Sequence, residues 1–293
     1  KNVNQTHTQG STANSSQIRA GGKAMIITHG DKENSGILIK GSDVAGLGGT
    51  VLKSDGKINI VAAEQSHQER SQNSSSGWSA GVAATYGSDG FAFGITAGGN
   101  LGRGYGNGDD RTWVNSHVGM DGSKTTIISG GDANLSGAVV RGKGVEVDIG
   151  GDLLATSLQD TMTYKGKQQN LSGQVTVGYG ASGSASYSQS KMNADYASVR
   201  EQTGIFAGDD GYQVNVKGHT QLDGALITST AQAEAERKNS FRTGTIDYRD
   251  IENHANYSGS SVGIGGGFSV GGGDGPKELG GVKLASQGQN HAQ

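Results

Sequence analysis

Apolar and polar residues alternate in short runs along this chain, and each run ends at a glycine turn. The stretch GYQVNVKGHTQLDGALITSTA (211–231) follows this pattern, and so do GILIKGSDVAGLGGTVL from Gly36 and TTIISGGDANLSGAVVRG from Thr125. Alternation with a period of two predicts β-strands. The three stretches therefore predict one arrangement of strand, glycine turn and strand, written three times.

These stretches recur with a long and a short period. If Gly41, Gly130 and Gly218 are aligned as the glycines that end the first strand, they lie 89 and 88 residues apart. Within this period the motif around Gly130 recurs around Gly150, about twenty residues on. Repeats of about 20 residues, closed by Gly, Asn or Asp, are typical of a parallel β-helix. We therefore expect an all-β, right-handed parallel β-helix.

Each coil of a β-helix points alternate side chains inward, where they stack on the neighbouring coils. Lys40, Ser42 and Lys217 are then expected on the outer surface. The expected core positions are Ile37, Ile39, Ile128, Val216 and Leu222. We predict one repeat domain over residues 1–293, with approximate units 22–110, 111–203 and 204–293.

After its strands and glycine turns, every copy departs from this repeat pattern in the same way. A polar stretch, which predicts irregular or helix-tolerant structure, begins at Glu64, at Leu158 and at Ile246. A section rich in Gly, Ser and aromatic residues follows each one with strict alternation, and GSDG at 87–90 indicates a hairpin turn. We expect β-hairpins that leave the β-helix.

The hairpin sections have one apolar face and one face of small residues. Residues 78–86 and 91–100 are each about as long as the 9–11 residues that a tilted strand needs to cross a bilayer. This alternation is typical of outer-membrane strands, but hairpins that pack on the β-helix or pair with one another would show it too. The candidate membrane-contact or hairpin-packing residues are Trp78, Val82, Tyr86, Phe91, Phe93, Ile95, Val175, Val177, Tyr179, Val262, Ile264, Phe268 and Val270.

Three motifs carry a family resemblance: GIFAGDDGYQVNVKGHTQLDGALITST (204–230), DIENHANYSGSSVGIGGGFS (250–269) and IISGGDANLSGAVVRG (127–142). They resemble the hemagglutinin repeats of filamentous-hemagglutinin-type two-partner secretion exoproteins. More narrowly, they are similar to the second hemagglutinin-repeat region of contact-dependent growth inhibition effectors of the CdiA type. The resemblance covers nearly the whole chain.

The resemblance implies a protein that is secreted to the surface of a Gram-negative bacterium by an outer-membrane transporter partner. In such effectors this region helps to deliver a C-terminal toxin across the target cell's outer membrane, so that membrane or its proteins are further expected partners. A passive adhesive stalk is the alternative function, because no toxin or receptor-binding segment is recognisable in the chain.

Composition and charge argue against several classes of protein and of partner. There are 53 glycines among 293 residues but a single proline and no cysteine, and the glycines do not recur every third position, which excludes collagen. A net charge of -3 argues against a nucleic-acid partner. The chain has no run of about 18 apolar residues, so its sequence predicts no transmembrane helix. The N-terminus lacks the features of a signal peptide, so we expect an interior fragment of a longer exoprotein.

The chain gives little sign of catalysis, and we expect no enzyme activity, no cofactor, no metal and no small-molecule substrate. The seven histidines are scattered, and GRGYGNG (102–108) lacks the spacing of a dinucleotide loop. Asp-rich turns at 30–36, 108–110 and 207–211 leave calcium open, although Asp beside Gly is ordinary turn chemistry. A β-helical polysaccharide lyase is the enzymatic alternative, with candidate residues Asp132, Arg141, Asp148 and Asp152.

Overall fold

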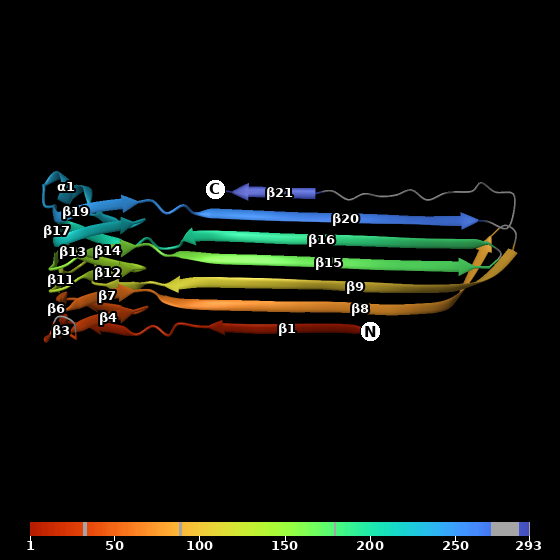
Figure 1. The fold of residues 1–293 in the computed structure, drawn as a ribbon, viewed down its shortest axis with the longest axis horizontal. Helices are drawn as coiled ribbons and strands as arrows, with labels where there is room; N and C mark the ends of the chain where they lie inside the picture. The colour runs from red at the N-terminus through yellow and green to blue at the C-terminus, as the bar shows by residue number, and fades with distance from the viewer. Residues whose placement is uncertain (32–33, 88–89, 179, 271–286, 293) are drawn as a thin grey trace.

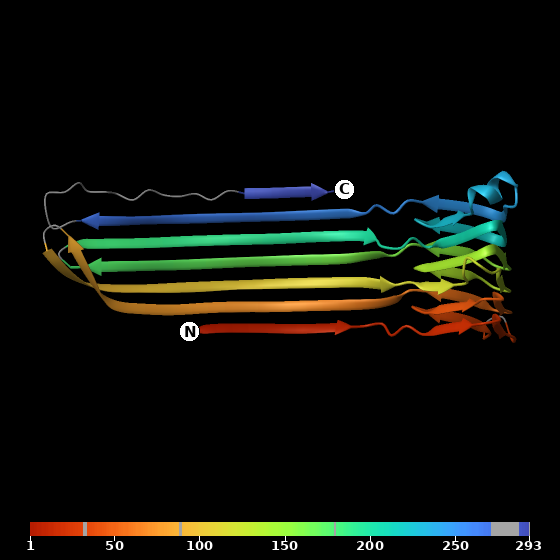
Figure 2. The same ribbon diagram turned by 180° about the vertical axis from the view of Figure 1, so that it is seen from behind.

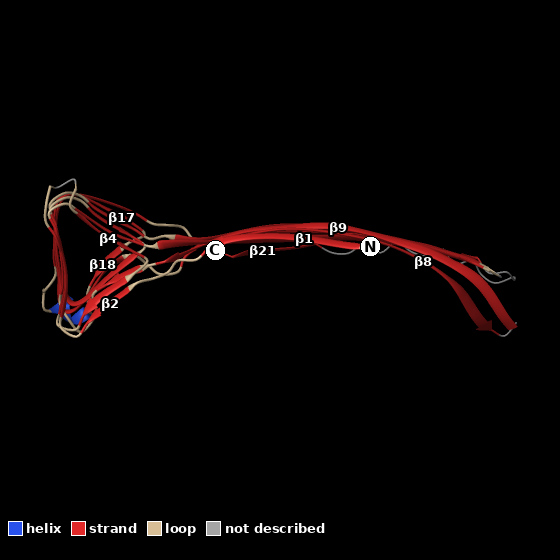
Figure 3. Cartoon of the chain, turned by 90° about the horizontal axis from the view of Figure 1, so that it is seen from below, coloured by secondary structure: helices blue, strands red, loops and turns tan. Residues whose placement is uncertain are grey.

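The computed structural model describes residues 1–293 except 32–33, 88–89, 179, 271–286 and 293. It contains two sheets: 14 strands stacked in parallel around a three-sided coil, and a seven-stranded antiparallel sheet that extends from one corner of that coil (Figures 1 and 3). The predicted all-β class with hairpin excursions is confirmed. The right-handed sense of the coils stays a prediction.

Three ladders of parallel strands form the sides of the β-helix-like stack. The first holds β2 (Gln17–Ala20), β5 (Asp43–Gly46), β10 (Ser116–Val118), the start of β13 (Ala138–Ile149), the start of β17 (Gly204–Asp223) and β18 (Leu226–Thr228). The second holds β3 (Lys23–Thr28), β6 (Gly49–Ser54), β11 (Thr125–Ser129), the rest of β13, the middle of β17 and the start of β19 (Ser240–Arg249). The third holds β4 (Gly36–Lys40), β7 (Lys57–Val61), β12 (Ala133–Ser136), β14 (Leu153–Thr156) and the ends of β17 and β19. One strand from each ladder makes a coil, and an excursion into the antiparallel sheet follows every second coil.

The core is a set of apolar columns that run along the stack. In the second ladder, directly paired residues form the column Ile26, Leu52, Ile127, Val147, Val214 and Phe241. Leu52 is fully buried, as are Ile58 and Ile60 of the third ladder. Because each side chain packs on the coils before and after it, no coil could bury its inner face alone. The short helix α1 (Ala231–Ala235), capped by Thr230, lies in the last coil and packs on β17, with Ala233 buried (Figure 1).

The prediction of Ile128 as a core residue is wrong. Its neighbour Ile127 is 2% exposed, whereas Ile128 is half-buried on the outer face, opposite Lys53 and Asp148. The adjacent isoleucines in TTIIS make the alternation ambiguous, and the inward-pointing Thr125 sets the register. Of the other expected core positions, Ile37, Ile39 and Val216 are buried, and Leu222 is partly buried against the same core.

The glycine alignment also needs correction. Gly130 and Gly218 lie at the corner between the second and third ladders, whereas Gly41 lies after the third ladder, at the end of a coil. Its structural equivalents are Gly137 and Gly224, and the three have φ angles of 53°, 65° and 58°. This left-handed conformation favours glycine. Each of these glycines ends the first coil of a two-coil unit.

The antiparallel sheet has the order β1 (Asn2–Ser11), β8 (Ala63–Gly87), β9 (Gly90–Val114), β15 (Gln159–Val177), β16 (Ala181–Val199), β20 (His254–Val270) and β21 (Gln287–Ala292). It is a single layer, as Figures 2 and 3 show. The expectation of irregular or helical structure in the polar stretches from Glu64, Leu158 and Ile246 is wrong, since most of their residues lie in strands. Strands on both sides satisfy their backbone hydrogen bonds, so these strands need no apolar face.

Candidate membrane-contact face

The strand register brings the apolar residues of all three excursions onto one face of the antiparallel sheet. Val82 lies opposite Ile95, Ile95 opposite Val177, Val177 opposite Ala181, and Ala181 opposite Val270. Directly opposed residues share a face, so this row crosses five strands on one side. We call this side the contact face.

Further rows on the contact face repeat the pattern toward the β-helix. One row contains Ala97, Val175, Gly183 and Phe268, and another contains Leu101, Leu171, Tyr187 and Ile264. Leu101, Leu171 and Tyr187 were not predicted from the sequence. The continued alternation beyond each glycine-rich section is the signal that could have found them.

The apolar side chains of this face lie in solvent. Trp78 is 85% exposed, Val82 77% and Ile95 70%. Most of the remaining large side chains are about half exposed or more: Phe93, Leu101, Leu171, Val175, Val177, Ile264, Phe268 and Val270. A contiguous apolar patch on a polar protein marks a contact site rather than ordinary surface.

Behind these apolar rows, the opposite face of the same strands carries small or polar side chains. One row across it contains Ser79, Gly98, Gln174, Ser184 and Gly267. Side-chain size and polarity therefore differ between two faces that the single layer leaves equally open. Solvation alone gives no reason for this segregation.

Three expected contact residues cannot be placed in full. The backbones of Tyr86 and Phe91 pair at the far end of the first hairpin, but their side chains lie outside the described part of the structure. Tyr179 lies outside the described residues. Val262 is on the contact face, opposite Gln189 and nearer to the β-helix.

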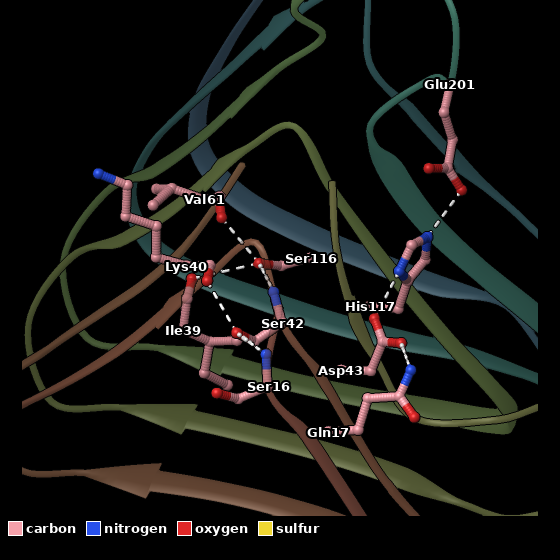
Figure 4. Close-up of polar contacts among 10 residues, drawn as sticks. All are labelled: Ser16, Gln17, Ile39, Lys40, Ser42, Asp43, Val61, Ser116, His117 and Glu201. Carbon is pink, nitrogen blue, oxygen red and sulfur yellow. Dashed lines mark hydrogen bonds and ion pairs between the residues drawn. The ribbon is translucent and has the colours of Figure 1, made fainter. Parts of the chain in front are cut away.

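A histidine bridge fixes the points where two hairpins re-enter the stack (Figure 4). His117, in the coil after the first hairpin, has Nδ1 2.8 Å from Asp43 Oδ1 and Nε2 2.9 Å from Glu201 Oε1. Glu201 follows the second hairpin. Partial burial lowers the pKa of His117, but hydrogen bonds to Glu201 and Asp43 outweigh it, so the pKa lies above its ordinary value of 6.5.

The candidate lyase residues do not meet at one place. Asp132 and Asp152 occupy the same corner in successive coils, where the Asp152 backbone N–H donates to Asp132 Oδ1 at 3.1 Å. That hydrogen bond, with Lys57 at 3.2 Å from Asp132 Oδ2, lowers the pKa of Asp132. Arg141 lies on another side of the stack, in the first ladder, over the ring of Phe206.

Asp109 and Asp210 of the candidate calcium turns, and Asp148 of the candidate lyase residues, interact with neighbouring side chains. Asp109 pairs with Arg70 at 2.7 Å, Asp210 lies 3.5 Å from Lys143, and Asp148 accepts from Asn215 at 3.4 Å. The turn at 30–36 lies partly outside the described residues. Within the described part of the chain no group of three or more His, Asp or Glu could hold a metal ion. No helix there is long and apolar enough to cross a bilayer.

Comparison with known proteins gives a family. The model of the hemagglutinin repeat family matches residues 1–171. Toxin CdiA of Escherichia coli is 38% identical over 278 residues, which cover 92% of this chain and 9% of that protein. The tRNA nuclease CdiA of Escherichia coli strain NC101 is 36% identical over 92% of this chain and 8% of that protein. Deoxyribonuclease CdiA of Dickeya dadantii strain 3937 is 38% identical over 77% of this chain and 7% of that protein.

The chain thus spans less than a tenth of the length of these three relatives. No solved structure matches it. The resemblance seen in the motifs is confirmed, and the chain belongs to the hemagglutinin repeat family.

Proposed function

We propose that this chain is a non-catalytic segment of a secreted exoprotein and that it helps to deliver a toxin across the outer membrane of a target cell. The contact face is the observation that carries the proposal. It offers exposed apolar side chains from three excursions along the chain, arranged as one surface that fits a lipid environment better than water.

The names of the relatives support delivery over any single enzyme activity. They are a toxin, a tRNA nuclease and a deoxyribonuclease, and all share the region that is similar to this chain. A region common to proteins named for different nucleic-acid substrates fits a task that all of them need. We place that task at the target surface, after export through an outer-membrane transporter partner.

A passive adhesive stalk is the second candidate. The observation in its favour is the stack of coils, whose length grows with the number of repeats and which needs no membrane contact. Measuring both cell adhesion and toxin delivery in the same cells distinguishes the two candidate functions.

The test is made in the full-length parent protein, with Val82→Asp and Ile264→Asp on the contact face. A charge at the middle of a bilayer costs roughly 2–4 kcal/mol, so we expect the variants to keep cell adhesion and to lose most growth inhibition of target cells. Ser184→Asp, on the small-residue face, is the matched control. If the contact-face variants inhibit target cells as well as the parent does, the membrane role is wrong.

A further inference from the structure

The lysines and arginines in the described strands of the antiparallel sheet are all on the contact face. Its described strands contain six Lys and Arg residues, and the register places every one on the same side as Trp78 and Val82. They are Arg70, Arg103, Arg111, Lys165, Lys167 and Lys191. The other face carries the carboxylates Glu69, Asp110 and Asp160 and no Lys or Arg in these strands.

Five of these residues form a band that borders the apolar rows. Arg103 is two residues from Leu101 along β9, and Lys167 is four residues from Leu171 along β15. Same-face neighbours along a strand lie roughly 7 Å apart, so cationic and apolar side chains meet at one boundary. We call Arg70, Arg103, Lys165, Lys167 and Lys191 the basic band.

Most of the band has no anionic partner among the residues that the structure describes. Arg70 pairs with Asp109 at 2.7 Å. The other four make no ion pair with any described residue. Lys167 and Lys191 are directly opposed across β15 and β16, and like charges in that position destabilise a sheet. An arrangement that places unneutralised cations next to each other is suited to an external anion.

We propose that the basic band binds the phosphate headgroups of an anionic lipid surface while the apolar rows beside it enter the acyl region. Lys and Arg attract anionic lipids when they lie close to the surface, and apolar side chains on the same face supply the second contribution. Tyr105 lies opposite Lys167 within the band and is partly exposed, as expected for tyrosine at the headgroup level. This inference rests on the proposed membrane contact and adds the chemistry of its ligand.

A second copy of the chain fits the contact face less well. Two contact faces packed in the same orientation would set one basic band against the other. The carboxylates nearest the band, Asp109 and Asp195, already face Arg70 and His254. A phosphate-bearing surface meets the band without this repulsion.

The experiment measures vesicle association of the full chain by flotation. One set of vesicles contains phosphatidylcholine alone, and the other contains phosphatidylglycerol in addition. The test variant is Lys165→Gln/Lys167→Gln/Lys191→Gln. The control variant, Lys40→Gln/Lys53→Gln/Lys217→Gln, removes the same charge from exposed positions on the β-helix.

The unmodified chain should prefer the anionic vesicles, and added salt should reduce that preference. The test variant should lose about a hundredfold in affinity for anionic vesicles, because each basic residue near the surface contributes roughly fivefold, and should keep its binding to neutral vesicles. Equal binding of the test variant and the unmodified chain to anionic vesicles would overturn the proposal, as would an equal loss in the control.

Two outcomes separate this inference from the function on which it rests. If neither vesicle binds the unmodified chain, the membrane contact itself fails. If both vesicles bind it equally and only Val82→Asp abolishes binding, the membrane contact stands and the headgroup site is wrong. A soluble oligonucleotide is the last comparison. If it binds as tightly as the anionic vesicles do, and the test variant loses that binding, the basic band binds soluble polyanions and the proposal of a lipid headgroup is wrong.

Discussion

Two adjacent isoleucines show how strictly the coil register sorts side chains. Ile127 is enclosed by Leu52 and Val147 from the coils on either side, whereas Ile128 points outward beside charged neighbours. The residues are chemically identical and differ only in which face of the strand they occupy. Register, rather than residue type, therefore decides their contribution to stability.

We predict that Ile127→Ala lowers the free energy of unfolding by about 2–5 kcal/mol, the range for buried Ile or Leu truncated to Ala. Ile128→Ala should cost less than half as much, because Ile128 lies on the outer face, where truncation leaves no enclosed cavity. Urea unfolding of the two variants makes the comparison. Equal losses would mean that the register of β11 is misplaced.

His117 makes a pH-dependent contribution to the stability of the folded chain at the points where the hairpins re-enter the stack. Because its folded pKa is raised above 6.5, its contribution to stability is complete below that value and is lost as the pH rises through the folded pKa. Unfolding midpoints should therefore decline as the pH rises above about 6.5. His117→Gln, which cannot be protonated, should show a shallower decline. The same slope in both proteins would rule out this role.

At the level of the elements, the coil corners depend on glycine. Gly137 ends the third coil with φ 65°, and a Cβ there would lie 2.6 Å from the Cβ of Ala62. A Cβ at Gly122, in the loop before β11, would meet no atom within 4 Å apart from its chain neighbours. The two glycines therefore offer a strained site and a matched open site within one coil.

Gly137→Ala should destabilise the chain by at least about 1–2 kcal/mol, the cost of a left-handed residue with a side chain, with the steric overlap in addition. Gly122→Ala should stay within about 0.5 kcal/mol of the parent. Thermal unfolding of both variants tests the expectation. A tolerated Gly137→Ala would show that the corner can relax.

The sequence predicted the stacked strands and the hairpin sections because both have a period of two with an apolar side. It could not predict the polar halves of β8 and β15, where Ser, Gln and Asn fill both faces and the stabilising partners are strands far along the chain. It also could not show that Val82, Val177 and Val270 share a face, because that depends on the combined lengths of turns and coils between them. The His117 bridge was hidden for the same reason, since its two carboxylates are 74 and 84 residues away.

For the whole molecule, the long repeat, in which the equivalent glycines Gly41, Gly137 and Gly224 lie 96 and 87 residues apart, has a geometric reason. Each unit adds two coils to the stack and two strands to the antiparallel sheet. Neighbouring strands are spaced by roughly 4.8 Å in both, so stack and sheet grow by the same amount per unit. The hairpins consequently line up as one layer and keep their apolar rows continuous.

This match predicts that a whole unit is easier to remove than a single coil. Deletion of residues 115–202 removes two coils and one hairpin and should leave cooperative unfolding near the parent midpoint. Deletion of residues 138–157 removes one coil only, offsets the hairpins by one strand spacing and should lower the midpoint clearly. Urea unfolding that ranks the two deletions the other way would contradict the matched growth of stack and sheet.

The central claim is that one face of the antiparallel sheet meets a membrane, and adjacent residues on opposite faces test it most directly. The chain has no cysteine, so Ile95→Cys and Thr96→Cys can each carry a single environment-sensitive fluorophore. On addition of anionic vesicles we predict a blue shift and higher intensity at position 95, on the contact face, and little change at position 96. Equal responses at the two positions, or no response at position 95, would contradict the account.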